Sequence, residues 1–162
     1  MEKHEWLRGY SGQSTEDLIS LQNEYRIPSL VLAFEQAISQ KALKETINEA
    51  ENTILAVEGL EREVNNGGYR QFFINTPDFV QSIVPSLKRI GCKETAQITQ
   101  RAIEALGVPS LRSDIVRSVV RADDKDRDRE LHACDDLYYN NTEPIALSLF
   151  EFIKSNRDRI KI

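Results

Sequence analysis

The chain has 162 residues, 40% of them hydrophobic, which is enough for one domain with a real core and too short to make two comfortably. Its 26 acidic and 21 basic residues give a net charge of −5, which disfavours direct binding of nucleic acid because phosphates require clustered Lys and Arg. No segment resembles a signal peptide or reaches transmembrane length, and the two cysteines lack the spacing of a zinc motif, so we expect a cytoplasmic protein with no membrane contact, no metal and no cofactor.

The N-terminal part of the sequence predicts a polar arm, residues 1–13, followed by two helices. Ser14 or Thr15, followed by two acidic residues, predicts the start of a short helix that runs to about Tyr25. A second helix is expected after Pro28. Its apolar residues recur at three-to-four spacing and are Leu30, Val31, Phe34, Ala37 and Ile38.

The longest predicted helix spans about Ala42 to Asn65 and carries apolar residues at helical period. Its carboxylates lie on two sides of the helix. They either form a solvated helix face, which composition alone favours, or provide a surface for a basic partner. One flank carries Glu45, Glu49 and Glu63, and the other carries Glu51 and Glu58.

The segment from Glu63 to Asn75 is the one around which the chain is organised. Its Asn-Asn pair disfavours a helix interior, and Gly67 and Gly68 can take the positive φ of a helix C-cap, so we expect the helix to end here. The aromatic residues that follow can anchor a turn between helices. The polar residues either bind a ligand or, as is more common, hydrogen-bond the backbone of their own turn. This structural motif comprises Glu63, Asn65, Asn66, Gly67, Gly68, Tyr69, Gln71, Phe72, Phe73 and Asn75.

The rest of the chain predicts further helices. One runs from Thr76 to Gly91, where Pro85 predicts a kink or a division into two short helices. The other patterns cover residues 93–106, a segment at 111–120 that is either a short helix or a loop, a helix that ends near residue 140, and a last helix opened by Thr142 and Pro144. No strand alternation is present, so the fold class is all-α, a single-domain multi-helix bundle.

Residues 123–130 form a charged run in which acids and bases alternate. In the best calcium-loop register Arg129 replaces the turn glycine, so no calcium site is expected. The alternation is typical of a solvated helix start with local ion pairs, each worth about 0.2 to 1 kcal/mol. The acids in and just after this run are Asp123, Asp124, Asp126, Asp128, Asp135 and Asp136.

No pattern in the sequence predicts catalysis. His4 and His132 are the only side chains that titrate near neutral pH when unperturbed, and no serine or cysteine motif accompanies either. A nucleophilic pair of His132 with Cys92 or Cys134 needs a geometry that the sequence does not show. Phosphate loops, dinucleotide motifs and the Glu-x-x-His of di-metal helices are missing. We therefore expect no catalytic residues, and a binding protein rather than an enzyme.

Several of these residues resemble a known family. The run Glu-Val-Asn-Asn-Gly-Gly-Tyr at 63–69, the Gln-Phe-Phe at 71–73, Asn75, the Ile90-Gly91 helix end and the Leu-Tyr-Tyr at 137–139 are similar to the bacterial DNA-mimic protein family. The resemblance covers about residues 42–156. It implies a homodimer that blocks the DNA-binding surface of a helix-turn-helix transcription factor, and it assigns the motif to the fold rather than to mimicry.

A DNA mimic needs carboxylates on a rigid scaffold in place of phosphates, so that they attract the Lys and Arg of the transcription factor. Helix positions i, i+4 and i+7 lie about 6 and 10.5 Å apart along the axis, which is comparable to phosphate spacing. The candidate groups are Glu45 with Glu49, Glu51 with Glu58, and the six aspartates at 123–136. The alternative is an immunity or antitoxin-type protein that masks a toxin.

Overall fold

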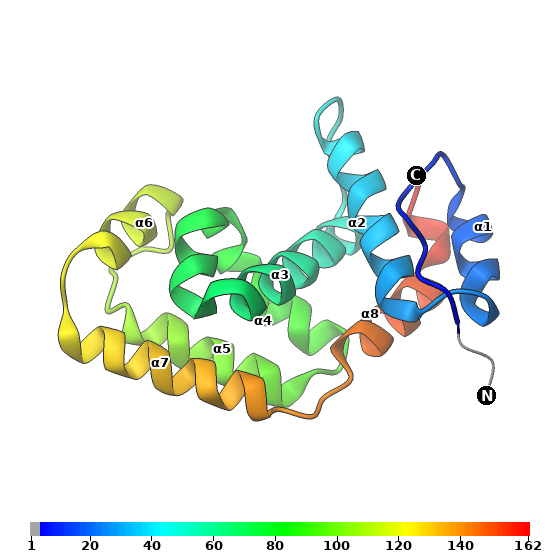
Figure 1. The fold of residues 1–162 in the computed structure, drawn as a ribbon. Coiled ribbons are helices and arrows are strands. Elements are labelled where there is room, and N and C mark those ends of the chain that lie inside the picture. The colour runs from blue at the N-terminus through cyan, green and yellow to red at the C-terminus, as the bar shows by residue number, and fades with distance from the viewer. Residues whose placement is uncertain (1–3) are drawn as a thin grey trace. The chain divides into compact units, whose positions relative to one another are not determined.

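Helices make up the regular structure of this protein (Figure 1). The computed structural model describes residues 4–162, and these form two compact units. Unit 1 comprises residues 4–58 and 144–162, and unit 2 comprises residues 59–143. Within the described residues there are eight α-helices, three 3-10 turns and no strand, apart from an isolated bridge between Glu5 and Tyr25. The predicted all-α class is confirmed.

Unit 1 is built on the packing of α2 (Ile27–Ala42) against α8 (Ile145–Ser155) and against α1 (Thr15–Ser20). Ser14 and Asp17 form the capping box that begins α1, as the hydroxyl and acidic residues predict. The unit also contains η1 (Leu21–Asn23), η3 (Arg157–Arg159) and the first part of α3 (Glu49–Asn75). The apolar side chains in its core include Leu30, Phe34, Ile38, Leu149, Phe150 and Ile153.

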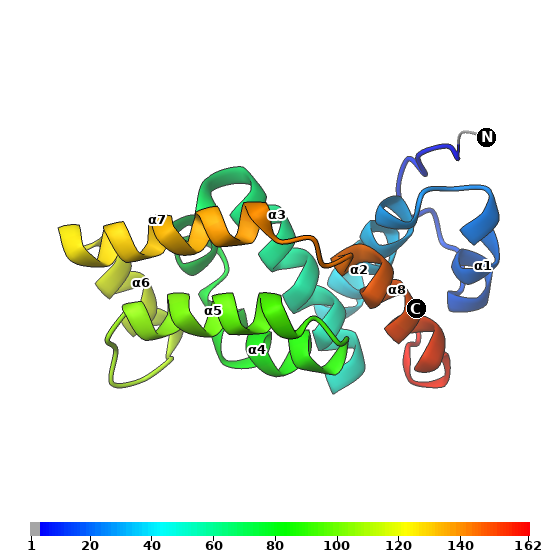
Figure 2. The ribbon, with the colours of Figure 1, turned by 90° about the horizontal axis from the view of Figure 1, so that it is seen from below.

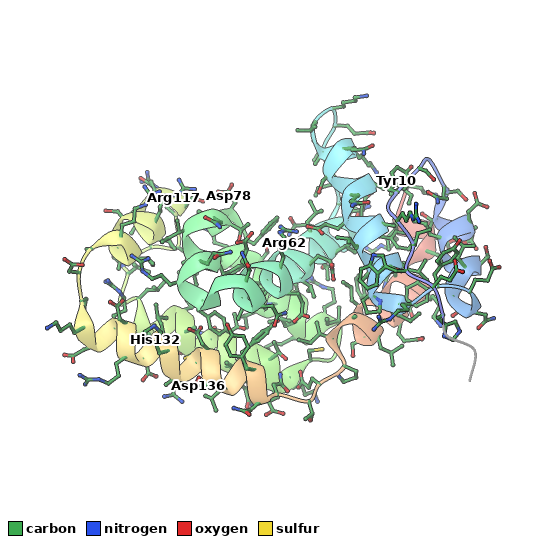
Figure 3. The ribbon with its side chains drawn as sticks, in the orientation of Figure 1. Tyr10, Arg62, Asp78, Arg117, His132 and Asp136 are labelled. Atoms are coloured by element: carbon green, nitrogen blue, oxygen red, sulfur yellow. The ribbon has the colours of Figure 1, made fainter. Side chains whose placement is uncertain are left out.

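The described part of the predicted arm is held by backbone contacts. Glu5 pairs with Glu24 and Arg26 through main-chain hydrogen bonds of 3.1 and 2.8 Å. The N–H of Tyr10 donates to Gln36 Oε1 of α2 at 2.8 Å (Figure 3). The first three residues of the arm lie outside the described residues. The described part of the arm, from His4 onward, therefore belongs to unit 1.

Unit 2 contains the rest of α3, then η2 (Pro77–Phe79), α4 (Val80–Arg89), α5 (Lys93–Ala105), α6 (Ser113–Arg121) and α7 (Lys125–Asn140). α5 packs against α4 on one side and α7 on the other, and α5 and α7 run side by side in Figures 1 and 2. Arg117 of α6 donates to the Ile74 carbonyl, and Ser113 donates to Asp78 of η2 (Figure 3). These contacts fasten α6, which is a helix rather than the alternative loop, to the end of α3.

α4 continues through Pro85, so the predicted division into two short helices does not occur. Proline lacks only its own amide, and therefore one intrahelical hydrogen bond is lost from a helix that is otherwise buried through Val80, Ile83, Val84 and Leu87. Burial of this apolar face outweighs the local preference of one residue.

The start of α3 differs from the sequence prediction. The helix begins at Glu49 rather than near Ala42, where α2 instead ends. Asn48 and Glu51 cap each other, since the N–H of Asn48 donates to Glu51 Oε1 at 3.1 Å and the N–H of Glu51 donates to Asn48 Oδ1 at 2.9 Å. Glu51 is only 1% exposed, and Lys41 Nζ lies 2.6 Å from its Oε2. This buried carboxylate therefore joins the end of α2 to the first turn of α3.

We predict that Glu51→Ala destabilises the protein strongly. The change leaves Lys41 without its buried partner and removes the cap of α3, and losing one member of a buried pair costs about 3 to 5 kcal/mol. The matched control is Glu49→Ala, two residues away and exposed, for which we expect a loss below about 1 kcal/mol. Urea unfolding followed by circular dichroism measures both, and equal losses would contradict the assignment.

Candidate functional site

The predicted turn is a break inside α3. Gly67 has φ −158° and ψ 18°, and Gly68 has φ 76° and ψ −176°, while the chain is helical on both sides. The Gly68 backbone lies in a region that is accessible essentially to glycine alone. The first helical segment therefore ends at these glycines, close to the predicted end at Asn65, and a second segment continues in a new direction to Asn75.

Side chains of α7 hold both sides of the break. Asp135 Oδ1 accepts the N–H of Tyr69 at 2.8 Å, and its carboxylate occupies the space that a Cβ at Gly68 would need. Tyr139 donates its hydroxyl to the Val64 carbonyl at 2.7 Å. Tyr138 donates to Glu61 Oε1. Backbone groups that the break removes from the helix ladder are in this way satisfied by α7.

The polar residues of the motif pair with one another. Glu63 Oε2 accepts from Gln71 Nε2 at 2.8 Å and from Asn75 Nδ2 at 2.9 Å, and its Oε1 lies 3.3 Å from Arg62 Nε. Burial acts to raise the pKa of Glu63, but these hydrogen bonds together hold that pKa below its ordinary value. Glu63, Gln71 and Asn75 thus contact one another within their own segment, through their side chains rather than through the backbone of the turn.

The aromatic residues of the motif are in the core of unit 2. Tyr69, Phe72 and Phe73 are fully buried. The Tyr69 hydroxyl lies 2.8 Å from Thr99 Oγ1 of α5, and its ring meets Tyr138 edge to face at a centroid distance of 5.9 Å. The second half of α3 is therefore fixed to both α5 and α7.

Two carboxylates beside the break have raised pKa values. Burial raises the pKa of Glu61, and the hydrogen bond from Tyr138 offsets only part of that effect. Burial also raises the pKa of Asp135 despite the hydrogen bond from the Tyr69 amide. Asp135, one of the predicted phosphate-mimicking acids, is thus occupied in holding the fold.

The acids of α3 do not form the predicted helical pairs. Glu45 is exposed but lies in the loop before α3, so it has no i, i+4 relation to Glu49. Glu51 is buried against Lys41, as described above, and is withdrawn from any partner. Glu49 is exposed and Glu58 is half-buried. The first pair fails because the helix starts later than predicted, and the second, whose two residues both lie in α3, fails because Glu51 is buried against Lys41.

The acids at the start of α7 are accessible. Asp123, Asp124, Asp126 and Asp136 are exposed, and the Asp128 side chain is 43% exposed. Asp124 is the N-cap of α7 and accepts the N–H of Arg127 at 3.0 Å, while Asp126 lies 3.5 Å from Arg129. Figure 3 shows Asp136 and His132 on α7. Glu130 was not among the acids predicted for mimicry, although it belongs to the same charged run. Its Oε1 lies 2.5 Å from Arg101 Nε of α5.

The cations of α7 interrupt this acidic surface. Lys125, Arg129, His132 and Asp136 are all exposed and follow one another at i, i+4, i+7 and i+11, on the side of α7 opposite its buried residues. Asp124 and Asp128 therefore lie beside a stripe that carries Lys125 and Arg129 near its start and Asp136 near its end. Arg127, in contrast, is buried and donates to the Ala122 carbonyl, so it does not add to the surface charge.

The candidates for chemistry have unsuitable surroundings. Cys92 and Cys134 are buried, and burial raises the pKa of Cys134 to about 11, which opposes formation of the thiolate. His132 is exposed on α7. Among the residues from 4 to 162, no cluster of three or more His, Cys, Asp or Glu is arranged to hold a metal ion. No helix in this part of the chain is long and apolar enough to cross a membrane.

These features define an all-α protein whose long helix is broken at two glycines and held there by one aspartate and two tyrosines of α7. The model of the DMP19-like protein family matches residues 45–156, which is more than half of the chain, and the protein belongs to this family of DNA mimics. Membership implies a DNA-mimic function, which is not enzymatic. No curated protein and no solved structure matches the chain.

We predict that Gly68→Ala costs more stability than Gly91→Ala. Both glycines have positive φ, 76° and 84°, and a residue with a side chain in such a conformation costs about 1 to 3 kcal/mol. Only at Gly68 would the added Cβ also collide with Asp135, whereas nothing lies within 4 Å at Gly91. Urea unfolding measures the loss of stability in each variant, which comes from backbone strain alone in Gly91→Ala and from strain plus the collision in Gly68→Ala. Equal losses of stability would show that Asp135 does not pack on the break.

The raised pKa of Glu61 predicts a pH-dependent difference between the protein and its Glu61→Gln variant. A group whose pKa is raised on folding stabilises the folded state fully below its unfolded pKa, near 4.5, and this contribution is lost as the pH rises through the folded value. Relative to Glu61→Gln, the protein should therefore lose stability between about pH 4 and about pH 7. Tyr138 can still donate to the amide oxygen of the variant. Unfolding free energies at the two pH values test this, and a constant difference would contradict it.

Proposed function

We propose that this protein is a DNA mimic that occupies the DNA-binding site of a helix-turn-helix transcription factor and relieves its repression. Membership in the DMP19-like protein family is the observation that carries this proposal. The partner is a basic DNA-binding protein, the protein itself contacts no nucleic acid, and it acts in the cytoplasm as a homodimer. The exposed acids at the start of α7 support the proposal.

The flank of α7 that starts at Asp124 is the part of the surface we assign to mimicry. Asp124 and Asp128 are separated by one turn, about 6 Å along the axis. One DNA strand carries a phosphate every 3.4 Å of axis, so the two aspartates are spaced roughly like every second phosphate. Asp123 extends this group beyond the helix end, whereas the helical period places Asp126 on the other side of the stripe of Lys125 and Arg129, and Asp136 on that stripe.

The basic stripe of Lys125 and Arg129 limits how a partner can approach. A basic partner docked on the centre of the exposed side of α7 would meet these like charges, which is unfavourable. The partner is therefore expected to approach along the flank of Asp124 and Asp128. The net charge of −5 is modest for a mimic, and a second copy doubles the number of acids available to a twofold-symmetric transcription factor.

The proposal is tested by isolating the partner and challenging it with DNA. Immobilised protein is exposed at low salt to the cytoplasm of its native cell, and the retained proteins are identified. Recovery of a helix-turn-helix protein that its own operator DNA displaces competitively would support mimicry. Retention of a nuclease or other toxin instead would support the alternative, an immunity or antitoxin-type protein.

We predict opposite effects from two pairs of substitutions on α7. Asp124→Asn with Asp128→Asn should weaken binding of the transcription factor by roughly tenfold, about 1.4 kcal/mol, because two phosphate equivalents are lost. Asn remains a good N-cap at position 124, so the helix is preserved. Lys125→Gln with Arg129→Gln should instead strengthen binding, and raised salt should reduce both effects.

Binding measured by fluorescence anisotropy, with labelled operator DNA as the competitor, compares the original protein with the two double variants. If both double variants bind like the original protein, then α7 is not the mimicking surface. If both weaken binding, the contact is not led by charge, and the effects reflect a change in the structure of α7, which circular dichroism would show.

A further inference from the structure

A pocket of about 250 Å³ lies at the break in α3 and has no part in the mimicking surface. It is lined by Gly67, Arg70, Gln71, Ile74 and Asn75, all from the family motif and the residues beside it. Among these lining residues none is acidic, one is cationic and two are carboxamides. Ile74 supplies apolar surface.

The carboxamides at this pocket are held in fixed positions. Gln71 Nε2 and Asn75 Nδ2 each donate one N–H to the same oxygen of Glu63, at 2.8 and 2.9 Å. A carboxamide has two N–H groups, so each side chain keeps one further donor. Arg70 adds an exposed guanidinium, whose planar fork matches a carboxylate. The pocket therefore combines a cation with two pre-positioned donors.

The charge around the pocket favours a small anion. Glu63 is 8% exposed, and its charge is met by Arg62 and by the two carboxamides. Arg70 then leaves the pocket locally positive on a protein of net charge −5. The negative field of the whole protein opposes a doubly charged phosphate more than a singly charged carboxylate.

We propose that this pocket binds a carboxylate, with Arg70 as its cationic partner and the Gln71 and Asn75 amides as further donors. The carboxylate belongs either to a small organic acid or to an acidic side chain of a partner protein. Both sources present the same group to the pocket, and the site is separate from the acids of α7 that we assign to mimicry.

Gly67 is needed for the shape of this pocket. Its φ of −158° is not positive, so the requirement for glycine here comes from space. A Cβ at Gly67 would collide with the amide of Gln71. Gly67→Ala should consequently displace the Gln71 amide.

The test is a titration of the ¹⁵N-labelled full chain with sodium glutamate, followed by NMR, with sodium chloride at equal ionic strength as the reference. Saturable shifts of the Arg70, Gln71 and Asn75 signals are expected. Arg70→Gln should weaken binding at least tenfold, while the matched variant Arg121→Gln, which removes an exposed arginine of α6, should bind as the original does. Gly67→Ala, if folded by circular dichroism, should also weaken binding.

A short blocked peptide with one glutamate side chain distinguishes the two sources. Tighter binding of the peptide than of free glutamate assigns the pocket to an acidic side chain of a protein, and the reverse assigns it to a small acid. The proposal is overturned if neither ligand gives saturable shifts at these residues, or if Arg121→Gln weakens binding as much as Arg70→Gln. Saturation by inorganic phosphate in preference to both would also overturn it.

Discussion

The hydrogen bond from the Tyr69 amide to Asp135 is the contact on which the arrangement of unit 2 depends. A helix that breaks in its middle frees backbone groups, and a buried N–H without a partner is costly. Asp135 satisfies the amide and fills the space beside Gly68, which fixes α7 against the break. Because Tyr138 and Tyr139 add their contacts on the other side of the glycines, the orientation of α7 follows from α3. The accessible acids of α7 are therefore placed by a feature in another helix.

The carboxylates of this protein divide into two groups according to their partners. Glu51 and Asp135 are paired with Lys41 and a backbone amide, and Glu63 is surrounded by donors from its own segment. Moving any of these toward an external partner would leave its donors unsatisfied, which costs about 1 to 3 kcal/mol for each buried group. The aspartates near the start of α7 are accessible, and an exposed ion pair such as that of Asp126 with Arg129 exchanges readily for contacts with a partner, although Asp124 also caps the helix. The structural acids and the acids that we propose for mimicry thus differ in what they already bind.

Local sequence signals predicted the helical class, the hydroxyl-capped start of α1 and the aromatic packing after Gly68, because each depends on residues close together in the chain. The errors arose from distant partners. No residue near Glu51 in the sequence indicates that this carboxylate is buried against Lys41. The apolar pattern that includes Ile47 extends across the loop before α3, so the predicted start of the helix was too early. Asp135 likewise gave no sign of its contact with a residue 66 positions away. The helical fold could be read from periodicity, but the sorting of carboxylates depends on tertiary contacts.

Acids and bases that alternate in the sequence are separated onto different sides of the molecule when the segment forms a helix. Residues 123–130 contain five acids and three bases, and the period of the helix places Lys125 and Arg129 on one stripe and Asp124 and Asp128 beside it. The field near the Asp124 flank is therefore negative, while at distances beyond about 8 Å salt screens it and the basic stripe offsets it. Such a surface distinguishes between partners that are in direct contact with it, more than it attracts partners over long distances. If this surface mimics DNA, its selectivity comes from how the partner must align with it. The cations of a groove-binding surface have to contact Asp124 and Asp128 and stay away from Lys125 and Arg129.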